Sequence, residues 1–415
     1  MEGPVRVKFL RDVFPLQENV EISGIIKFSS NFLKNAYEVV KSNNSQNSHF
    51  IFLIDNSYSM QADNKIDILK DNLIKLIDIG YLDESYVSIF TFGEDSELII
   101  KYMNVLKNKD YIINKIKKIK AISPQTYAYK GFKKIHEEFN DFNMKGCSNK
   151  IIYFTDGEDF DENSALKEIK KLVKENNFIV TTVGVGEEYN DVFLLDAANE
   201  GLGGFYHLNN IDQFFPEIKD EIQKTYKEIL TNVEIINLFY PSSVEIQEVY
   251  KVGNGVTKLS FDEKEIFCGN ISNEDRIFFK LRVKNPKKSG KYNILNASIK
   301  YNIGKQEKID EFSFKVMLSN DPNLSFSIDS EVVELNKLIV LYKKINEFRN
   351  YMEMNNEKEA KRVINEISPL MYQLSDDEDI KQIIDDIKEG KIINTDVTRT
   401  LLSYTKTKTK TNFID

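Results

Sequence analysis

The stretch HFIFLIDNSYS, residues 49–59, decides how this chain folds. Its first six residues, 49–54, form a nearly continuous apolar run, which is typical of a strand covered on both faces of a parallel sheet. The run ends at Asp55, and two hydroxyl side chains follow at alternate positions, Ser57 and Ser59. Because ligands bind at the carboxyl ends of the strands in open α/β sheets, we expect these three side chains to face one crevice.

From residue 49 to about residue 215, apolar runs alternate with stripes of helical spacing. Strands that alternate with amphipathic helices are typical of a mainly parallel sheet with helices on both faces. We therefore predict an α/β domain over residues 48–216, with a Rossmann-like, doubly wound sheet. The expected strands lie at 49–54, 87–92, 98–102, 150–155, 178–185 and 204–208, and the expected helices at 66–77, 128–142, 163–175 and 190–199.

The rest of the chain shows two other patterns. After residue 231 the hydrophobic period falls to about two, so residues 231–320 predict an antiparallel, β-sandwich-like domain. Short strands within residues 1–30 lack partners of their own, and we expect them to complete this β-domain, into which the α/β domain is inserted. Helical stripes return over residues 329–390, and the Thr- and Lys-rich segment 391–415 is expected to be a mobile tail.

Composition argues against several classes of protein. The 56 basic and 65 acidic residues of this 415-residue chain give a net charge of −9, which disfavours a general polyanion binder. Two cysteines and three histidines leave little material for a disulfide scaffold or a histidine-based site. The most basic run, 115–120, has isoleucines at helical spacing, so it predicts a solvated helix face, and we expect no nucleic acid partner. The first residues lack the pattern of a secretory signal and no apolar run is long enough to span a membrane, so we expect a cytoplasmic protein without membrane insertion.

Two further segments supply oxygen atoms at the same edge of the predicted sheet. The sequence Thr155-Asp156-Gly157 ends the second buried strand, and Thr126 lies in a loop that precedes a helix. Together with the first stretch they provide two carboxylates and three hydroxyls, which suit a hard divalent cation, Mg²⁺ first, with Mn²⁺ or Ca²⁺ as alternatives. In such a site an incoming carboxylate can fill a remaining coordination position. The predicted metal ligands are Asp55, Ser57, Ser59, Thr126 and Asp156.

With these residues in place, the chain from about 49 to 215 resembles a von Willebrand factor type A domain with its metal-ion-dependent adhesion site. The D-x-S-x-S element of that family matches residues 55–59, and three further stretches, 89–93, 182–186 and 197–206, also look like the family. The resemblance implies that the metal bridges to an acidic side chain of a protein partner. Tyr58 departs from the family pattern, because many relatives carry glycine there. The five signature positions match Asp55, Ser57, Ser59, Thr126 and Asp156, and the hydroxyls are expected to contact the metal directly and the carboxylates through water.

Three functions remain open at this point. The first is a non-enzymatic, metal-dependent interaction module that serves as an intracellular scaffold or adaptor, with no catalytic residues. The second is a Mg²⁺-assisted hydrolase that acts on phosphoesters, because bound Mg²⁺ is also a Lewis acid. The third is a structural subunit whose metal binds no ligand. The interaction module is the leading hypothesis, since the sequence offers no phosphate-binding glycine loop and no nucleophile paired with histidine.

An acidic run bears on the charge of the partner. Residues 158–162, with the sequence EDFDE, directly follow Asp156 and therefore lie near the predicted metal. Acidic groups at this rim disfavour an acidic partner unless that partner also presents basic groups.

Overall fold

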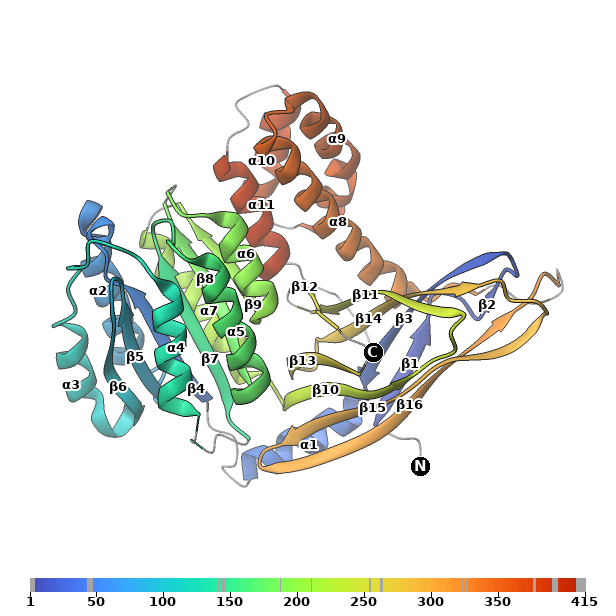
Figure 1. Ribbon diagram of the computed structural model, residues 1–415, viewed down its shortest axis with the longest axis horizontal. Helices are drawn as coiled ribbons and strands as arrows, with labels where there is room; N and C mark the ends of the chain where they lie inside the picture. Colours follow the sequence, from blue (N-terminus) through green and yellow to red (C-terminus); the bar gives the residue numbers. More distant parts are fainter. Residues whose placement is uncertain are drawn as a thin grey trace. The chain divides into compact units, whose positions relative to one another are not determined.

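The structure is a computed structural model (Figure 1). It describes residues 4–42, 48–140, 142, 146–186, 188–209, 211–253, 255–261, 264–321, 324, 327–375, 378–389 and 395–407. The chain divides into two compact units. The α/β unit comprises Glu38–Thr231 with Asn302–Gln306, and the β/helical unit comprises Met1–Tyr37, Asn232–Tyr301 and Glu307–Asp415. Within the described ranges, no helix combines the length and apolar character needed to cross a membrane.

The α/β unit is built on a six-stranded sheet in the order β6-β5-β4-β7-β8-β9. Strand β6 runs antiparallel to β5, and all other neighbours are parallel. Every residue of β4 and β7 is buried, as expected for central strands covered on both faces. The predicted doubly wound fold is therefore confirmed. The strands are β4 (Ser48–Asp55), β5 (Ser85–Phe92), β6 (Ser96–Asn104), β7 (Ser148–Thr155), β8 (Phe178–Val185) and β9 (Leu202–Leu208).

Helices cover both faces of this sheet (Figure 1). Helix α5 packs between α4 and α6 on one face, and α2 packs against α3 and α7 on the other. A short 3-10 helix, η1 (Tyr58–Asn64), connects the end of β4 to α2. The helices are α2 (Lys65–Asp78), α3 (Val105–Ile116), α4 (Ala128–Phe139), α5 (Glu162–Asn176), α6 (Asp191–Glu200) and α7 (Phe214–Tyr226).

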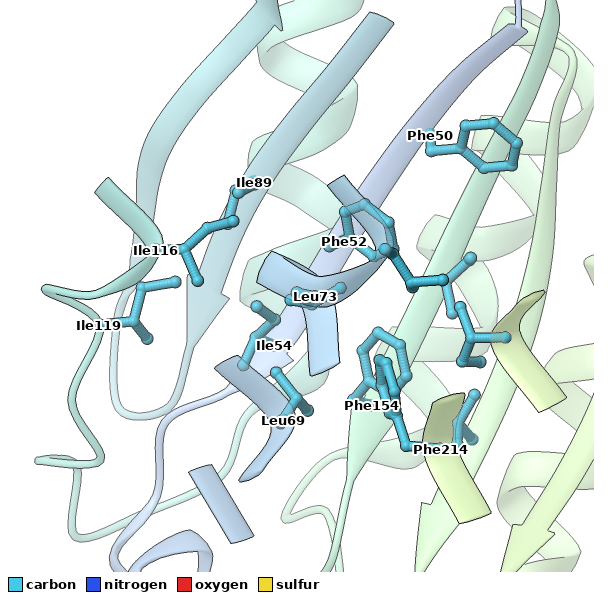
Figure 2. Packing of buried hydrophobic residues seen from close by; sticks show 14 of the residues in the cluster. Phe50, Phe52, Ile54, Leu69, Leu73, Ile89, Ile116, Ile119, Phe154 and Phe214 are labelled. Atoms are coloured by element: carbon cyan, nitrogen blue, oxygen red, sulfur yellow. The ribbon is translucent and has the colours of Figure 1, made fainter. Parts of the chain in front are cut away.

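The core on the α2 face shows how β4 is fixed in place. Because side chains alternate along a strand, Phe52 and Ile54 point to the same face of β4. There they join Leu69 and Leu73 of α2, together with Phe154 of β7, in one buried cluster (Figure 2). A register slip of one residue would move this set to the opposite face, so the cluster holds the carboxyl end of β4 at a defined position.

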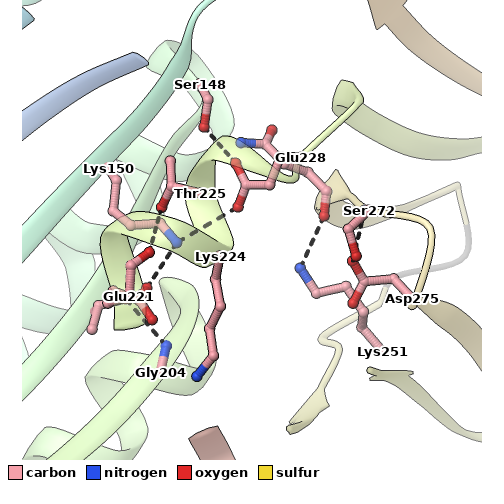
Figure 3. Close-up of polar contacts among 12 residues, drawn as sticks. Ser148, Lys150, Gly204, Glu221, Lys224, Thr225, Glu228, Lys251, Ser272 and Asp275 are labelled. Carbon is pink, nitrogen blue, oxygen red and sulfur yellow. Dashed lines mark hydrogen bonds and ion pairs between the residues drawn. The ribbon is translucent and has the colours of Figure 1, made fainter. Parts of the chain in front are cut away.

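Helix α7 is attached to the sheet by a buried ion pair (Figure 3). Glu221 of α7 accepts hydrogen bonds from the Lys150 ammonium on β7, at 2.8 Å, and from the Thr181 hydroxyl on β8, at 2.7 Å. Burial works to raise the pKa of Glu221, but the charge of Lys150 outweighs it and lowers the pKa to about 2. Because Lys150 is near the amino end of its strand, the ion pair anchors the end of the sheet opposite to Asp55.

The β/helical unit contains two five-stranded sheets, in the orders β1-β3-β14-β11-β12 and β13-β10-β15-β16-β2. Strand β3 pairs antiparallel with β14, and β2 pairs parallel with β16, so the N-terminal strands lie in the same sheets as strands after residue 230. The strands are β1 (Val5–Phe9), β2 (Val13–Phe14), β3 (Asn19–Phe28), β10 (Leu230–Phe239), β11 (Val244–Val252), β12 (Val256–Lys258), β13 (Glu265–Ile271), β14 (Arg276–Lys284), β15 (Gly290–Ile303) and β16 (Gln306–Leu318).

Besides the helices that cover the α/β sheet, the described residues form five α-helices: α1 (Ser30–Ser42), α8 (Ser330–Glu353), α9 (Glu357–Leu374), α10 (Glu378–Lys388) and α11 (Thr395–Thr407). The prediction of a mobile tail over residues 391–415 is wrong for α11. Leu401 and Leu402 are fully buried, and Lys406 donates a hydrogen bond to Thr257 of β12 at 3.1 Å. Helix α11 packs on α8, so its polar Thr and Lys residues are held by tertiary contacts that composition does not reveal. The remaining residues of the predicted tail, 391–394 and 408–415, lie outside the described part of the chain.

Candidate metal centre

The candidate centre lies where β4 and β7 end side by side. Asp55 is the last residue of β4, and Asp156 directly follows β7. The two strands are parallel neighbours, so their carboxyl ends meet at one edge of the sheet. The loop before α4 is held against this edge, because Asn56 O accepts a hydrogen bond from Ser123 N at 2.9 Å and Tyr58 N donates to Ser123 O at 2.8 Å. Three segments that are distant in sequence thus converge.

Four of the five predicted ligands are brought into direct or relayed contact. The Ser57 and Ser59 hydroxyls lie 2.9 Å apart and share a hydrogen bond. The Ser59 hydroxyl also donates to Asp156 Oδ1 at 2.7 Å. Asp55 Oδ1 accepts from the backbone N–H of Ser57 at 2.8 Å, which fixes the chain as it leaves the strand. These bonds aim the hydroxyl pair toward the carboxylate of Asp156.

Thr126 lies in the loop that is held against this group. Its side chain is buried, and its carbonyl accepts a hydrogen bond from Phe160 N at 3.0 Å. The Thr126 hydroxyl makes no hydrogen bond to the other four predicted ligands, all of which lie in the described part of the chain. The structure therefore brings four of the residues together by direct bonds, and Thr126 through its loop.

The charges at this edge are deeply buried. Asp55 and Asp156 are both fully buried. Burial raises the pKa of Asp55 to about 6, although hydrogen bonds from Ser57 and Thr155 oppose the shift. The Thr155 hydroxyl donates to Asp55 Oδ2 at 2.7 Å, so both oxygens of this carboxylate are oriented. Because burial disfavours the charged form of Asp55, a cation bound nearby would stabilise that form.

Lys65 is a member of this group that sequence reasoning missed. Its ammonium lies 2.7 Å from Asp156 Oδ2, on the carboxylate oxygen opposite to the one that Ser59 contacts. Lys65 is the first residue of α2, and its side chain is mostly buried. The only signal in the sequence is its place as the first basic residue after the D-x-S-x-S element.

The oxygen set fits a divalent cation. Asp55 has no ion-pair partner among the residues that the structure describes, and a buried carboxylate without a counter-charge is costly. The same part of the chain holds no group of three or more His, Cys, Asp or Glu side chains that could bind a metal. A metal at this point would thus depend on the hydroxyls, as in the set of oxygens that hard cations prefer.

Comparisons with known proteins agree with this fold. Residues 50–158 match the family model of the von Willebrand factor type A domain. The uncharacterized protein YfbK of Escherichia coli (strain K12) is 23% identical over 201 residues, which are 48% of this chain and 34% of that protein. The chain therefore spans only about a third of the length of this curated relative.

Two solved structures extend the likeness to nearly the whole chain. A von Willebrand factor type A protein from Catenulispora acidiphila has a TM-score of 0.78 at 14% identity and covers 98% of this chain and 97% of its own. The ArnB paralog VWA2 from Sulfolobus acidocaldarius has a TM-score of 0.61 at 17% identity and covers 97% of both chains. At such identities the likeness shows a shared fold. Together with the family model, it establishes that this chain carries a von Willebrand factor type A domain, and the candidate metal centre lies within it.

Proposed function

We propose that this chain is a metal-dependent protein–protein interaction module whose bound Mg²⁺ takes up an acidic side chain of a partner protein. Von Willebrand factor type A domains generally mediate protein–protein interaction. In this proposal residues 48–216 form the binding module, and the β-domain over 231–320 with the helices over 329–390 positions it. Mn²⁺ and Ca²⁺ are the alternative cations.

The observation that carries the proposal is the buried pair of carboxylates beside a chain of hydroxyls. Asp55 is fully buried without a cationic partner in the described residues, while the Ser57 and Ser59 hydroxyls lie within hydrogen-bonding distance of each other. Bound Mg²⁺ would supply positive charge to Asp55 and an electrophilic position for an incoming carboxylate. The protein would supply the orientation.

Each side chain then has a role. Ser57, Ser59 and Thr126 would hold the metal directly, and Asp55 and Asp156 would hold it through water. Asp55 also fixes the backbone of Ser57, and Asp156 orients the Ser59 hydroxyl. Neutral direct ligands leave the metal strongly electrophilic, so it gains from the carboxylate of a partner.

An intracellular scaffold or adaptor role forms part of the proposal. Cys268 is a buried free thiol. Unpaired thiols are typical of proteins in a reducing compartment.

Affinity capture tests the proposal. The full chain is immobilised and exposed to a lysate with Mg²⁺ or with EDTA, and the retained proteins are identified. We expect partners that are lost in EDTA and lost with Asp55→Ala, and retained with the control Asp67→Ala, which changes an exposed carboxylate on α2. Partner binding that survives both EDTA and Asp55→Ala would contradict the proposal. A melting temperature raised by Mg²⁺ without any metal-dependent partner would instead favour a purely structural metal.

A further inference from the structure

Three large apolar side chains stand exposed around the candidate metal centre. The exposed fractions are 57% for Tyr58, 62% for Ile122 and 65% for Phe160. We call these three residues the apolar rim. Side chains of this size are usually buried, and a group of them beside one site is typical of an interaction surface.

The apolar rim is tied to the loops that carry the predicted ligands. Tyr58 lies between Ser57 and Ser59 in the sequence and donates its backbone N–H to Ser123 O. Ile122 N donates a hydrogen bond at 2.8 Å to the carbonyl of Asn56, the residue directly after β4. Phe160 N donates to Thr126 O at 3.0 Å. One rim residue thus accompanies each loop of the centre.

The ring of Phe160 is held in place by the neighbouring side chains of α4 and of the residue before that helix. This ring packs on Tyr127 with ring centroids 5.5 Å apart, and the Lys130 ammonium lies 5.1 Å from the centroid of Tyr127. Lys130 also pairs with Asp95 at 3.3 Å. The Phe160 ring is therefore held in place before a partner binds, so binding costs less conformational entropy.

The charges around the rim are divided. Glu94 and Glu158 are exposed, and neither has an ion-pair partner within the described residues. The backbone N–H of Glu94 donates to Ser123 Oγ at 2.6 Å, so Glu94 borders the same loop as Ile122. Lys117, Lys118 and Lys120 are exposed on the segment that leads to Ile122. A basic side chain of a partner can therefore form an ion pair with Glu94 or Glu158.

We propose that the apolar rim selects a partner segment in which the metal-binding carboxylate is flanked by apolar side chains and accompanied by a basic residue. This inference rests on the proposed function, since the carboxylate is placed by the metal. The metal requires a carboxylate from any partner. The apolar rim, Glu94 and Glu158 then distinguish one acidic segment from another. Alternating apolar and charged contacts of this kind give specificity as well as affinity.

Synthetic peptides test the inference with the full-length chain. The reference peptide has a central Asp with a Leu on each side and one Lys. Three variants carry Ser in place of both Leu, Glu in place of Lys, or Asn in place of Asp. Binding is measured by fluorescence anisotropy in Mg²⁺ and in EDTA, and Mg²⁺ uptake is measured separately by calorimetry.

We expect the Ser-flanked peptide and the Glu peptide each to bind at least about tenfold more weakly than the reference peptide. Phe160→Ser and Ile122→Ser should remove the preference for Leu without changing Mg²⁺ uptake. The control Leu106→Ser, which changes an equally exposed apolar residue on α3, should keep the preference. Glu158→Gln should reduce the preference for Lys.

The outcomes separate the inference from the proposed function. Equal binding of all three Asp peptides, or a preference that survives Phe160→Ser and Ile122→Ser together, overturns the inference and leaves the proposed function standing. Absence of binding by every peptide, with Mg²⁺ uptake intact, also overturns it. Binding that persists in EDTA, or with the Asn peptide, overturns the proposed function as well.

Discussion

At the scale of single residues, Lys65 carries the most consequential charge at the candidate centre. Its ammonium lies 2.7 Å from Asp156 Oδ2, and the carboxylate is fully buried. Without metal, Lys65 neutralises Asp156. A metal bound at the candidate centre would lie close to the same ammonium and would be repelled by it. We therefore expect Lys65 to stabilise the metal-free protein and to weaken the binding of the metal.

Replacement of Lys65 tests this balance. We expect Lys65→Met to raise the affinity for Mg²⁺ about tenfold, because one repulsive charge is removed from a poorly solvated site. The same change should lower the melting temperature in EDTA, since it leaves Asp156 without a counter-charge. Calorimetric titration and thermal unfolding measure the two effects, and Lys70→Met serves as the control on the same helix. Weaker Mg²⁺ binding by Lys65→Met would mean that Lys65 chiefly positions Asp156.

His49 makes stability depend on pH. It is fully buried on β4, with its Nε2 atom 2.9 Å from Ser88 Oγ. Burial lowers the pKa of His49 from 6.5 to about 3. Between about pH 6.5 and pH 3, His49 is therefore protonated in the unfolded chain and neutral in the folded chain. The contribution of His49 to stability is present above pH 6.5 and is lost as the pH falls, by about 1.4 kcal/mol per pH unit.

The change His49→Gln isolates this contribution. Between pH 6.5 and 5, the free energy of unfolding should fall less steeply with decreasing pH for His49→Gln than for the wild-type chain. The two slopes should differ by about 1.4 kcal/mol per pH unit. Urea unfolding followed by circular dichroism measures both slopes. Asp55 titrates in both chains, so the comparison cancels its effect. Equal slopes for the wild type and His49→Gln would contradict the assignment.

At the scale of elements, the loops of the centre are packed on one another at Gly93. A methyl group at this position, directly after β5, would overlap the Ser123 side chain and the amide of Asn56. We expect Gly93→Ala to push the loop that carries Thr126 away from the end of β4 and to lower Mg²⁺ affinity about tenfold, without removing a ligand oxygen. Gly157→Ala is the matched control, because its methyl group would meet only Ser59 Oγ, at an ordinary distance of 3.7 Å. Unchanged Mg²⁺ affinity in calorimetry of Gly93→Ala would show that the loop does not contribute.

The elements also show what the sequence could predict. Strands β4 and β7 were predictable because burial on both faces leaves an uninterrupted apolar run. Helix α11 was not, because its buried face includes Thr405 and Lys406, whose partners come from tertiary structure. The carboxylates and the serine hydroxyls were predictable from their places at strand ends. The contact of Lys65 with Asp156 was not, because it depends on how η1 leads the chain into α2.

At the scale of the whole molecule, all five predicted ligands belong to the α/β unit. That unit is one continuous stretch, Glu38–Thr231, apart from residues 302–306. The β/helical unit collects its strands from both sides of this stretch, which agrees with an inserted α/β domain. The whole-chain likeness to the Catenulispora acidiphila protein shows that the combination of the two units is shared with another solved structure.

Anomalous X-ray diffraction from crystals of the full chain grown with Mn²⁺ would locate the metal that we propose for this site. We expect a single strong peak at the carboxyl ends of β4 and β7, roughly 2.0–2.6 Å from the hydroxyl oxygens of Ser57, Ser59 and Thr126. Crystals of the Asp55→Ala variant grown in the same way should lose that peak. A wild-type map without density among these hydroxyls, or with the metal bound elsewhere, would contradict the proposed metal centre.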